Sequence, residues 1–292
     1  MELWEAKLEI SMPHAEAADQ YMLESGLGEW SLHEDVIIGR AWIIGIFEDE
    51  TAARNGCAAL KAALPAEAEG AFAVRKLPDA DWKNSYKAHF KAWAFGRLHW
   101  VPVWERETFV VPEGHSVLWL DPGMAFGTGN HETTRLCIER LVEFERTLAP
   151  GKARNLKVVD AGCGSGILAL SASLLGFADV MGFDDDAEAI RVSIENAELN
   201  HLVSKVRFET AGLHVGLAPA DVILANIQSD VLIRYAQALT LAVEPGGMLA
   251  MSGILSSEAH SVMGAFAAGT KGWSSDSRVL GEWCDVCLRR PS

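Results

Sequence analysis

The sequence lacks the features that mark several specialised classes of protein. No apolar run approaches the roughly 20 residues that a membrane-spanning helix needs. The first residues, MELWE, show no basic stretch followed by an apolar core, as a secretion signal would. No segment repeats with a period of about 20 to 50 residues, and none has low complexity, which argues against a solenoid or a disordered tail. We therefore expect a soluble, cytoplasmic protein that does not enter membranes.

Cysteines and basic residues are both scarce. Five cysteines in 292 residues is an odd number, and it suits a reducing compartment better than a disulfide framework. Cys284 and Cys287 form a CxxC pair, but no second pair or suitably spaced histidines complete a zinc site, so we expect no metal. The net charge is -15, from 25 Lys and Arg against 40 Asp and Glu. This balance argues against direct binding of nucleic acid and favours a basic partner.

The length and the changing composition of the chain predict two domains, since one core seldom serves 292 residues. Residues 1–76 suggest short elements in the order βαββαβ, which predicts a small ferredoxin-like α+β domain. Segment 77–106 mixes aromatic and basic residues, and we interpret it as a linker with packed rings rather than as an RNA-stacking surface. Residues 107–292 alternate strands with helices, which predicts an α/β domain with a Rossmann-like, doubly wound parallel sheet.

A glycine loop directly after an apolar strand is the first motif with chemical content. Residues 157–168 read KVVDAGCGSGIL, with Gly162, Gly164 and Gly166 between a buried strand and the start of a helix. Glycine permits a positive φ and lets a ligand approach the backbone where any Cβ would collide. Such turns serve both dinucleotides and S-adenosylmethionine, so the loop alone does not choose between these cofactors.

A carboxylate at the end of the next predicted strand helps to decide between a dinucleotide and S-adenosylmethionine. Asp184 follows the first glycine of the loop by 22 residues, where it can accept both hydroxyls of a ribose. The loop has GxGxG spacing, and Ile167 stands where a dinucleotide enzyme usually has its third glycine. This favours a methyltransferase over a nicotinamide dehydrogenase. The three consecutive acids Asp184, Asp185 and Asp186 also suit a helix N-cap. Asp184 can bind ribose while Asp185 or Asp186 caps the helix.

Two further segments are expected to reach the same crevice. Residues 121–134, DPGMAFGTGNHETT, combine three glycines with an aromatic ring and hydroxyls, which suits a lid over a small polar ligand. Asn226 follows the apolar strand 221–225, at the edge of the sheet where the glycine loop is expected. Its carbonyl oxygen can accept a hydrogen bond from a substrate amine and orient the nitrogen lone pair. The alternative is a turn asparagine that bonds its own backbone.

With these segments the chain resembles the PrmA family, the methyltransferases of large-subunit ribosomal protein L11. The resemblance covers nearly the whole chain. Its most specific motif is DPGMAFGTGNHETT, and DAGCGSGILAL at 160–170, ANIQSDVL at 225–232 and SGIL at 252–255 support it. The implied fold is a class I S-adenosylmethionine-dependent methyltransferase domain over 107–292. The small domain over 1–76 would then recognise the protein substrate.

The resemblance also implies a cofactor, a reaction and a set of site residues. S-adenosyl-L-methionine would be the cofactor, and Asn226 the catalytic residue. The expected cofactor-binding residues are Thr134, Gly162, Gly164, Asp184, Asn226, Phe126 and Gly127. A neutral amine of ribosomal protein L11, either a lysine side chain or the N-terminus, would attack the sulfonium methyl group. Two alternatives stay open: a lysine methyltransferase of another protein, and a non-enzymatic S-adenosylmethionine-binding regulator.

Overall fold

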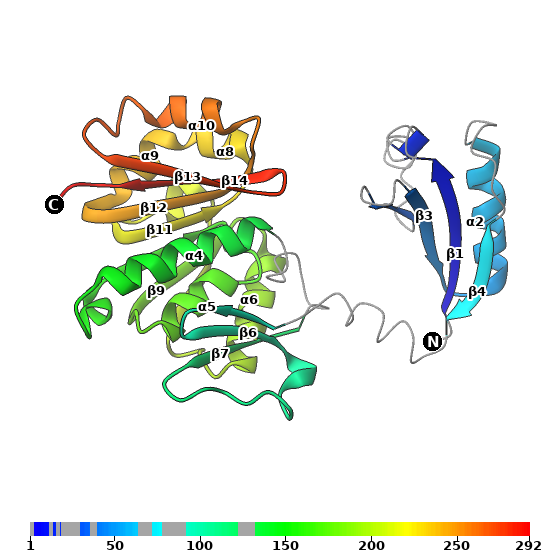
Figure 1. Ribbon diagram of the computed structural model, residues 1–292, viewed down its shortest axis with the longest axis horizontal. Helices are drawn as coiled ribbons and strands as arrows, with labels where there is room; N and C mark the ends of the chain where they lie inside the picture. Colours follow the sequence, from blue (N-terminus) through cyan, green and yellow to red (C-terminus); the bar gives the residue numbers. More distant parts are fainter. Residues whose placement is uncertain are drawn as a thin grey trace. The chain divides into compact units, whose positions relative to one another are not determined.

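The chain divides into two compact units, Met1–His89 and Phe90–Ser292, which Figure 1 shows in two colour ranges. The computed structural model describes residues 3–11, 14–15, 18, 30–35, 40–63, 72–77, 92–121 and 132–292. Among these residues, no helix is both long enough and apolar enough to cross a membrane.

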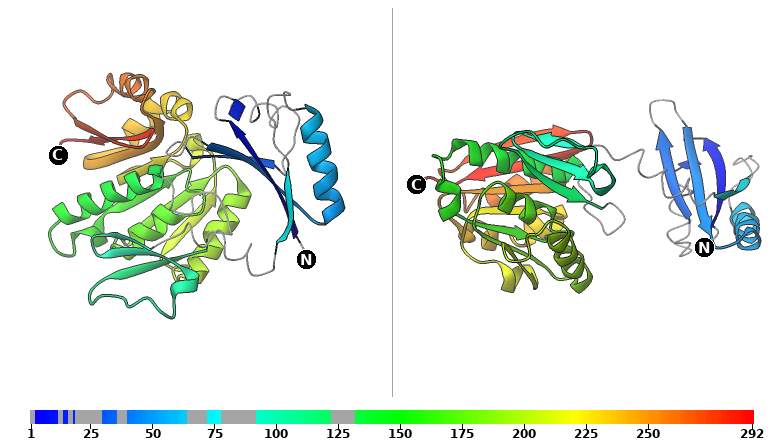
Figure 2. Two further views of the ribbon diagram at one scale, coloured as in Figure 1. Left: turned by 45° about the vertical axis from the view of Figure 1, so that its right-hand side comes forward. Right: turned by 90° about the horizontal axis from the view of Figure 1, so that it is seen from below.

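The first unit is built on a four-stranded antiparallel sheet with the strand order β2-β3-β1-β4. Its elements are β1 (Leu3–Ser11), β2 (Trp30–Asp35), β3 (Arg40–Phe47), α2 (Glu50–Ala63) and β4 (Ala73–Leu77). Alternate residues of β1, among them Leu8, pack with Leu60 of α2 in one core, and α2 runs along one face of the sheet (Figure 2). This order is that of a ferredoxin-like domain, as predicted. The first helix expected there falls largely outside the described residues.

The second unit begins at Phe90, within segment 77–106, which we predicted to be a linker. β5 (Trp93–Phe95) and β6 (Leu98–Pro102) form a three-stranded sheet with β7 (Ser116–Leu120). Trp100 is 1% exposed, and its indole N–H donates to Ser171 Oγ at 2.9 Å. Large rings gain from burial, and an indole N–H needs a partner when buried. β5 and β6 are therefore part of the second unit and give Phe95, Leu98 and Trp100 to its core, whereas we predicted a linker up to residue 106.

The main sheet of the second unit has seven strands in the order β10-β9-β8-β11-β12-β14-β13. The five strands from β10 to β12 are parallel, and β14 lies antiparallel between β12 and β13. The strands are β8 (Lys157–Ala161), β9 (Asp179–Asp184), β10 (Val206–Thr210), β11 (Ala220–Asn226), β12 (Val243–Leu255), β13 (Ser274–Leu280) and β14 (Trp283–Arg289).

Helices cover both faces of this sheet (Figure 1). They are α4 (Glu132–Thr147), α5 (Ile167–Leu174), α6 (Ala187–Leu199), α7 (Leu213–Gly216), α8 (Ser229–Arg234), α9 (Ala236–Ala242) and α10 (Ala259–Phe266). Successive residues of one strand serve opposite cores: Val158 packs with Leu141 of α4, and Val159 packs with Leu232 of α8. The predicted doubly wound sheet is thus confirmed.

The strand order reverses between β8 and β11. From β8 the chain first builds outward through β9 and β10, and it then returns to place β11 on the other side of β8. In open parallel sheets, ligands bind beyond the carboxyl ends of the strands at such a switch point. Because both faces are covered by helices, this crevice is the place in the sheet that the fold leaves for a ligand.

Candidate active site

A cavity of about 330 Å³ opens at the switch point. Its walls come from the carboxyl ends of four strands and from the segments that follow them: Gly162, Gly164, Phe183, Asp184, Asp185, Ala211, Gly212, Leu213, Asn226, Ile227, Gln228 and Val231. The volume lies within the range of small-molecule sites, and the walls combine apolar surface with a few polar groups. The cavity is therefore the candidate site for a small cofactor.

The glycine loop forms one side of this cavity. Gly162, Gly164 and Gly166 have φ angles of 72°, 52° and 76°, a region that side chains rarely adopt. A Cβ on Gly162 would lie 2.4 Å from Cγ2 of Ile227. The N–H groups of residues 162 and 163 both donate to the carbonyl of Phe183, at 2.9 and 3.0 Å. The loop is thus tied to β9 and presents bare backbone to a ligand.

Asp184 ends β9 and faces the glycine loop. Its Oδ2 accepts from the N–H of Gly164 at 2.9 Å, and its Oδ1 accepts from the N–H of Asp186 at 3.1 Å. Asp186 in turn caps α6 by accepting from the N–H of Glu188 at 2.8 Å. The prediction that Asp185 or Asp186 caps the helix is therefore confirmed, and the cap is Asp186. Each oxygen of Asp184 keeps a second lone pair, and a ribose diol can donate to both.

Asn226 ends β11, two strands away from Asp184 in the sheet, and also lines the cavity. Its Nδ2 donates to Oγ1 of Thr134 in the first turn of α4, at 3.2 Å. The side chain thus bonds a partner 92 positions away, in contrast to the alternative of a turn asparagine bound to its own backbone. With the amide N–H₂ directed to Thr134, the carbonyl oxygen of Asn226 is left to accept from a ligand in the cavity.

A buried ion pair holds α4, and with it Thr134, against the sheet. Arg140 of α4 and Asp285 of β14 are each 1% exposed, and Nε and Nη2 of the arginine donate to the two carboxylate oxygens, both at 2.7 Å. Arg140 also pairs with Asp276 of β13. Such two-pronged pairs fix geometry as well as charge. The pair therefore helps to fix how α4, the helix that carries Thr134, docks on the sheet.

Four of the seven predicted site residues line the cavity, namely Gly162, Gly164, Asp184 and Asn226. Thr134 is 1% exposed and lies behind Asn226, to which it is hydrogen-bonded. Phe126 and Gly127 lie outside the described residues.

Sequence reasoning missed the wall that follows β10. Ala211, Gly212 and Leu213 line the cavity, and the N–H of Ala211 donates to the backbone carbonyl of Asp184 at 2.8 Å. The signal was available, because alternating strands and helices were predicted over 107–292 and ligands collect at the carboxyl ends of such strands. The apolar residues Ile227 and Val231 complete a surface against which a flat ring can pack.

A buried acid lies near the glycine loop. Asp160 of β8 is 1% exposed, and its Oδ2 accepts from the N–H of Ala169 at 3.0 Å. Its Oδ1 has no partner among the described residues. Burial, with a smaller contribution from Asp184, raises the pKa of Asp160 to about 7 against the opposing hydrogen bond. Burial also raises the pKa of the Cys163 thiol well above its usual range, so that this thiol stays neutral.

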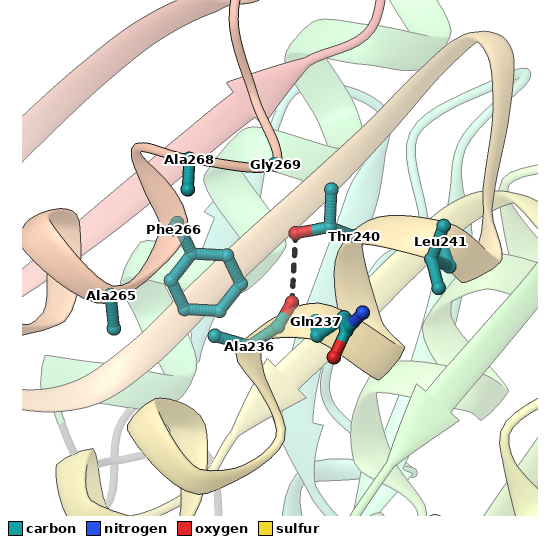
Figure 3. Close-up of a pocket in the computed structure, with 8 residues that line it drawn as sticks. All are labelled: Ala236, Gln237, Thr240, Leu241, Ala265, Phe266, Ala268 and Gly269. Carbon is teal, nitrogen blue, oxygen red and sulfur yellow. Dashed lines mark hydrogen bonds between the residues drawn. The ribbon is translucent and has the colours of Figure 1, made fainter.

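A larger cavity of about 420 Å³ lies between α9 and α10, and Figure 3 shows its lining. The residues are Ala236, Gln237, Thr240, Leu241, Ala265, Phe266, Ala268 and Gly269. The hydroxyl of Thr240 is used inside α9, where it donates to the carbonyl of Ala236 at 2.8 Å. No charged side chain is in this lining, so the smaller cavity is the one equipped for chemistry.

The family model described as ribosomal protein L11 methyltransferase (PrmA) matches residues 8–291. The chain belongs to this family. The resemblance inferred from the motifs is thereby confirmed. A ribosomal protein L11 methyltransferase of Geobacter sp. (strain M21) is 41% identical over 196 residues, which are 67% of this chain and 63% of that protein. One of Actinobacillus pleuropneumoniae serotype 3 (strain JL03) is 35% identical over 280 residues, 95% of this chain and 89% of that protein.

A solved structure agrees with this family assignment. The crystal structure of ribosomal protein L11 methylase from Lactobacillus delbrueckii subsp. bulgaricus matches with a TM-score of 0.59 and 29% identity, over 70% of this chain and 100% of that one. Together with the strand order, this confirms the predicted class I methyltransferase fold.

Proposed function

We propose that this chain transfers methyl groups from S-adenosylmethionine to amino groups of ribosomal protein L11. The observation that carries the proposal is one cavity in a PrmA-family chain, with bare glycine backbone and Asp184 on one side and Asn226 on the other. The glycine backbone and Asp184 suit the cofactor, and Asn226 suits an amine.

The walls of the cavity fit S-adenosylmethionine part by part. Asp184 has free lone pairs for the ribose hydroxyls, and the backbone at Gly162 and Gly164 admits the methionine portion. Leu213 and Ile227 give apolar surface for the adenine ring. Of the remaining predicted residues, Thr134 acts through Asn226, and the loop with Phe126 and Gly127 is proposed to cover the ligand. Bound there, the cofactor supplies an electrophilic methyl group on a positively charged sulfur.

Asn226 is proposed to orient the acceptor amine. Its carbonyl oxygen accepts an N–H of the amine, which leaves the nitrogen lone pair directed at the methyl group. Lysine titrates near pH 10.4 in water, and transfer into a desolvated site favours its neutral form. No dedicated base is then needed, because the lysine loses its proton to solvent before transfer. The amine that takes the methyl group becomes an alkylammonium ion, and the sulfonium would leave as the neutral thioether S-adenosylhomocysteine. Holding both reactants in a reactive geometry is worth about 7 to 11 kcal/mol in well-oriented reactions, and Asn226 is proposed to supply one part of this.

The small domain over 1–76 is proposed to recognise the protein substrate, and the second unit, Phe90–Ser292, is proposed to be the catalytic domain. Residues 1–60 contain twelve acidic residues against three basic ones. Ribosomal proteins are basic, so this surplus favours their approach and disfavours nucleic acid as the direct partner. Because the proposed substrate belongs to the ribosome, we propose that the reaction takes place in the cytoplasm and away from membranes.

Transfer of a radiolabelled methyl group tests this function. The purified chain is incubated with labelled S-adenosylmethionine and with ribosomal protein L11, and mass spectrometry maps the labelled residues. Label on lysine side chains or on the N-terminus of L11 is expected. Cofactor binding without transfer would indicate a regulator. Label that appears in an extract only on another protein would indicate a methyltransferase of different specificity.

A further inference from the structure

The segment that presents Asn226 is closely packed on both sides. Ile227 follows Asn226, and its side chain lies where a Cβ on Gly162 would stand, 2.4 Å from Cγ2. Its backbone lies against Gly253 of β12, where a Cβ would be 2.6 Å from the carbonyl oxygen of Ile227. Gly253 has a φ of 80°, so glycine is required there by conformation and by space. The segment therefore has little room to shift.

A single carboxylate holds the far end of this segment. Glu258 Oε2 accepts from the hydroxyl of Ser229 and from the N–H of Leu255, the latter at 3.1 Å. Ser229 is the first residue of α8 and is 7% exposed, Leu255 ends β12, and Glu258 is the N-cap of α10. One oxygen thus joins three elements. Hydrogen bonds to a charged acceptor are among the stronger ones.

We propose that Glu258 is a positioning residue for methyl transfer, which acts through Ser229 to fix the segment that presents Asn226. This inference rests on the function proposed above. Only two residues separate Asn226 from Ser229, so a displacement at the start of α8 is passed on to the amide. A misplacement of about 1 Å can cost about a hundredfold in rate.

This role predicts that loss of Glu258 lowers turnover much more than it lowers cofactor affinity. The glycine loop and Asp184 are held by bonds to each other and to Phe183, and none of these bonds involves Glu258. Loss of the Glu258 carboxylate therefore loosens the side of the cavity that orients the amine and leaves the ribose side in place. Ile227 is the residue of this segment that also faces the cofactor's ring, so cofactor affinity should change less than kcat. A residue needed only for stability would lower the melting temperature without this selective effect on kcat.

The experiment compares kcat, KM for the protein substrate and cofactor affinity in Glu258→Ala and Ser229→Ala. Each is expected to lower kcat by about tenfold while cofactor affinity changes less than about threefold. Since the two residues act through one hydrogen bond, the double variant should be no slower than the slower single variant. Glu258→Gln keeps an amide oxygen for both donors and should restore most of kcat. Asp230→Asn, on the exposed side of α8, is the matched control and should keep the wild-type kcat.

Two results would overturn the positioning role. One is a wild-type kcat in folded Glu258→Ala and Ser229→Ala, and the other is an equal loss of kcat and cofactor affinity. If Glu258→Ala does not fold, Ser229→Ala decides, because it removes only one hydroxyl. Asn226→Ala is measured alongside. Full turnover there would overturn the proposed role of Asn226 as well, whereas a slow Asn226→Ala beside a fast Glu258→Ala would overturn the role of Glu258 alone.

Discussion

The two sides of the crevice hold their functional groups by different means. The glycine wall, made of Gly162, Gly164 and Asp184, is shaped by backbone conformation and by hydrogen bonds within one β-α-β unit. The amide wall, Asn226 with Thr134 behind it, depends on a side-chain hydrogen bond between distant parts of the chain. The first arrangement suits tight binding of a cofactor common to many enzymes. The second suits the orientation of one particular substrate group.

Asn226→Ala should produce the largest effect and tests the amide wall directly. We expect kcat to fall by about a hundredfold, because the amine loses the group that orients its lone pair. Cofactor affinity, measured by calorimetry, should change less than about threefold, since the glycine wall is intact. Equal losses in both quantities would mean that Asn226 only binds cofactor, and the contrast between the two walls would disappear.

Asp160→Asn tests whether a neutral acid underlies the glycine wall. Because the pKa of Asp160 is raised by burial to about 7 and is near 3.9 in an unfolded chain, only the unfolded state loses this proton as pH rises from about 4 to 7. The free energy of unfolding then falls with rising pH over this range and levels off above it.

The asparagine variant lacks this dependence and still offers an oxygen to the N–H of Ala169. Between pH 5 and pH 8, its stability relative to the wild type should therefore rise by about 2.5 kcal/mol. Urea unfolding of both proteins at the two pH values measures this difference in the free energy of unfolding. The other titrating groups are shared by both proteins, so their contributions cancel. Parallel pH profiles of the two proteins would show that Asp160 is ionised throughout.

Asp184→Ala tests the glycine wall itself. Loss of the two acceptors for the ribose hydroxyls should weaken cofactor binding at least tenfold, since each hydrogen bond to a charged group contributes about 1.5 kcal/mol or more. The kcat at saturating cofactor should fall much less. Asp179→Asn, at the exposed opposite end of β9, is the matched control and should bind normally. Unchanged affinity in Asp184→Ala would remove this residue from the site.

The two walls also differ in how far the sequence predicted them. The glycine wall is local: a strand, three glycines and an acid at the next strand end suffice to place it, and Asp186 was foreseen as a possible cap. The link between Asn226 and Thr134 spans 92 positions and depends on how α4 docks. Similarly, the burial of Trp100 shows that composition alone did not separate a linker from a folded strand. Pairings that tertiary packing decides leave no periodic signal in the sequence.

Thr134→Val gives the smallest of these effects and refines the description of the amide wall. Valine fills the buried space of threonine but offers no oxygen to Nδ2 of Asn226, so the amide keeps its place and loses one restraint on its orientation. We expect kcat to fall about three- to fivefold, less than 1 kcal/mol, with little change in cofactor affinity. Thr134→Ser keeps the hydroxyl and should retain the wild-type kcat. If Thr134→Val instead weakened cofactor binding more than turnover, Thr134 would belong to the cofactor site directly, as the family resemblance implied, and the two walls would share one ligand.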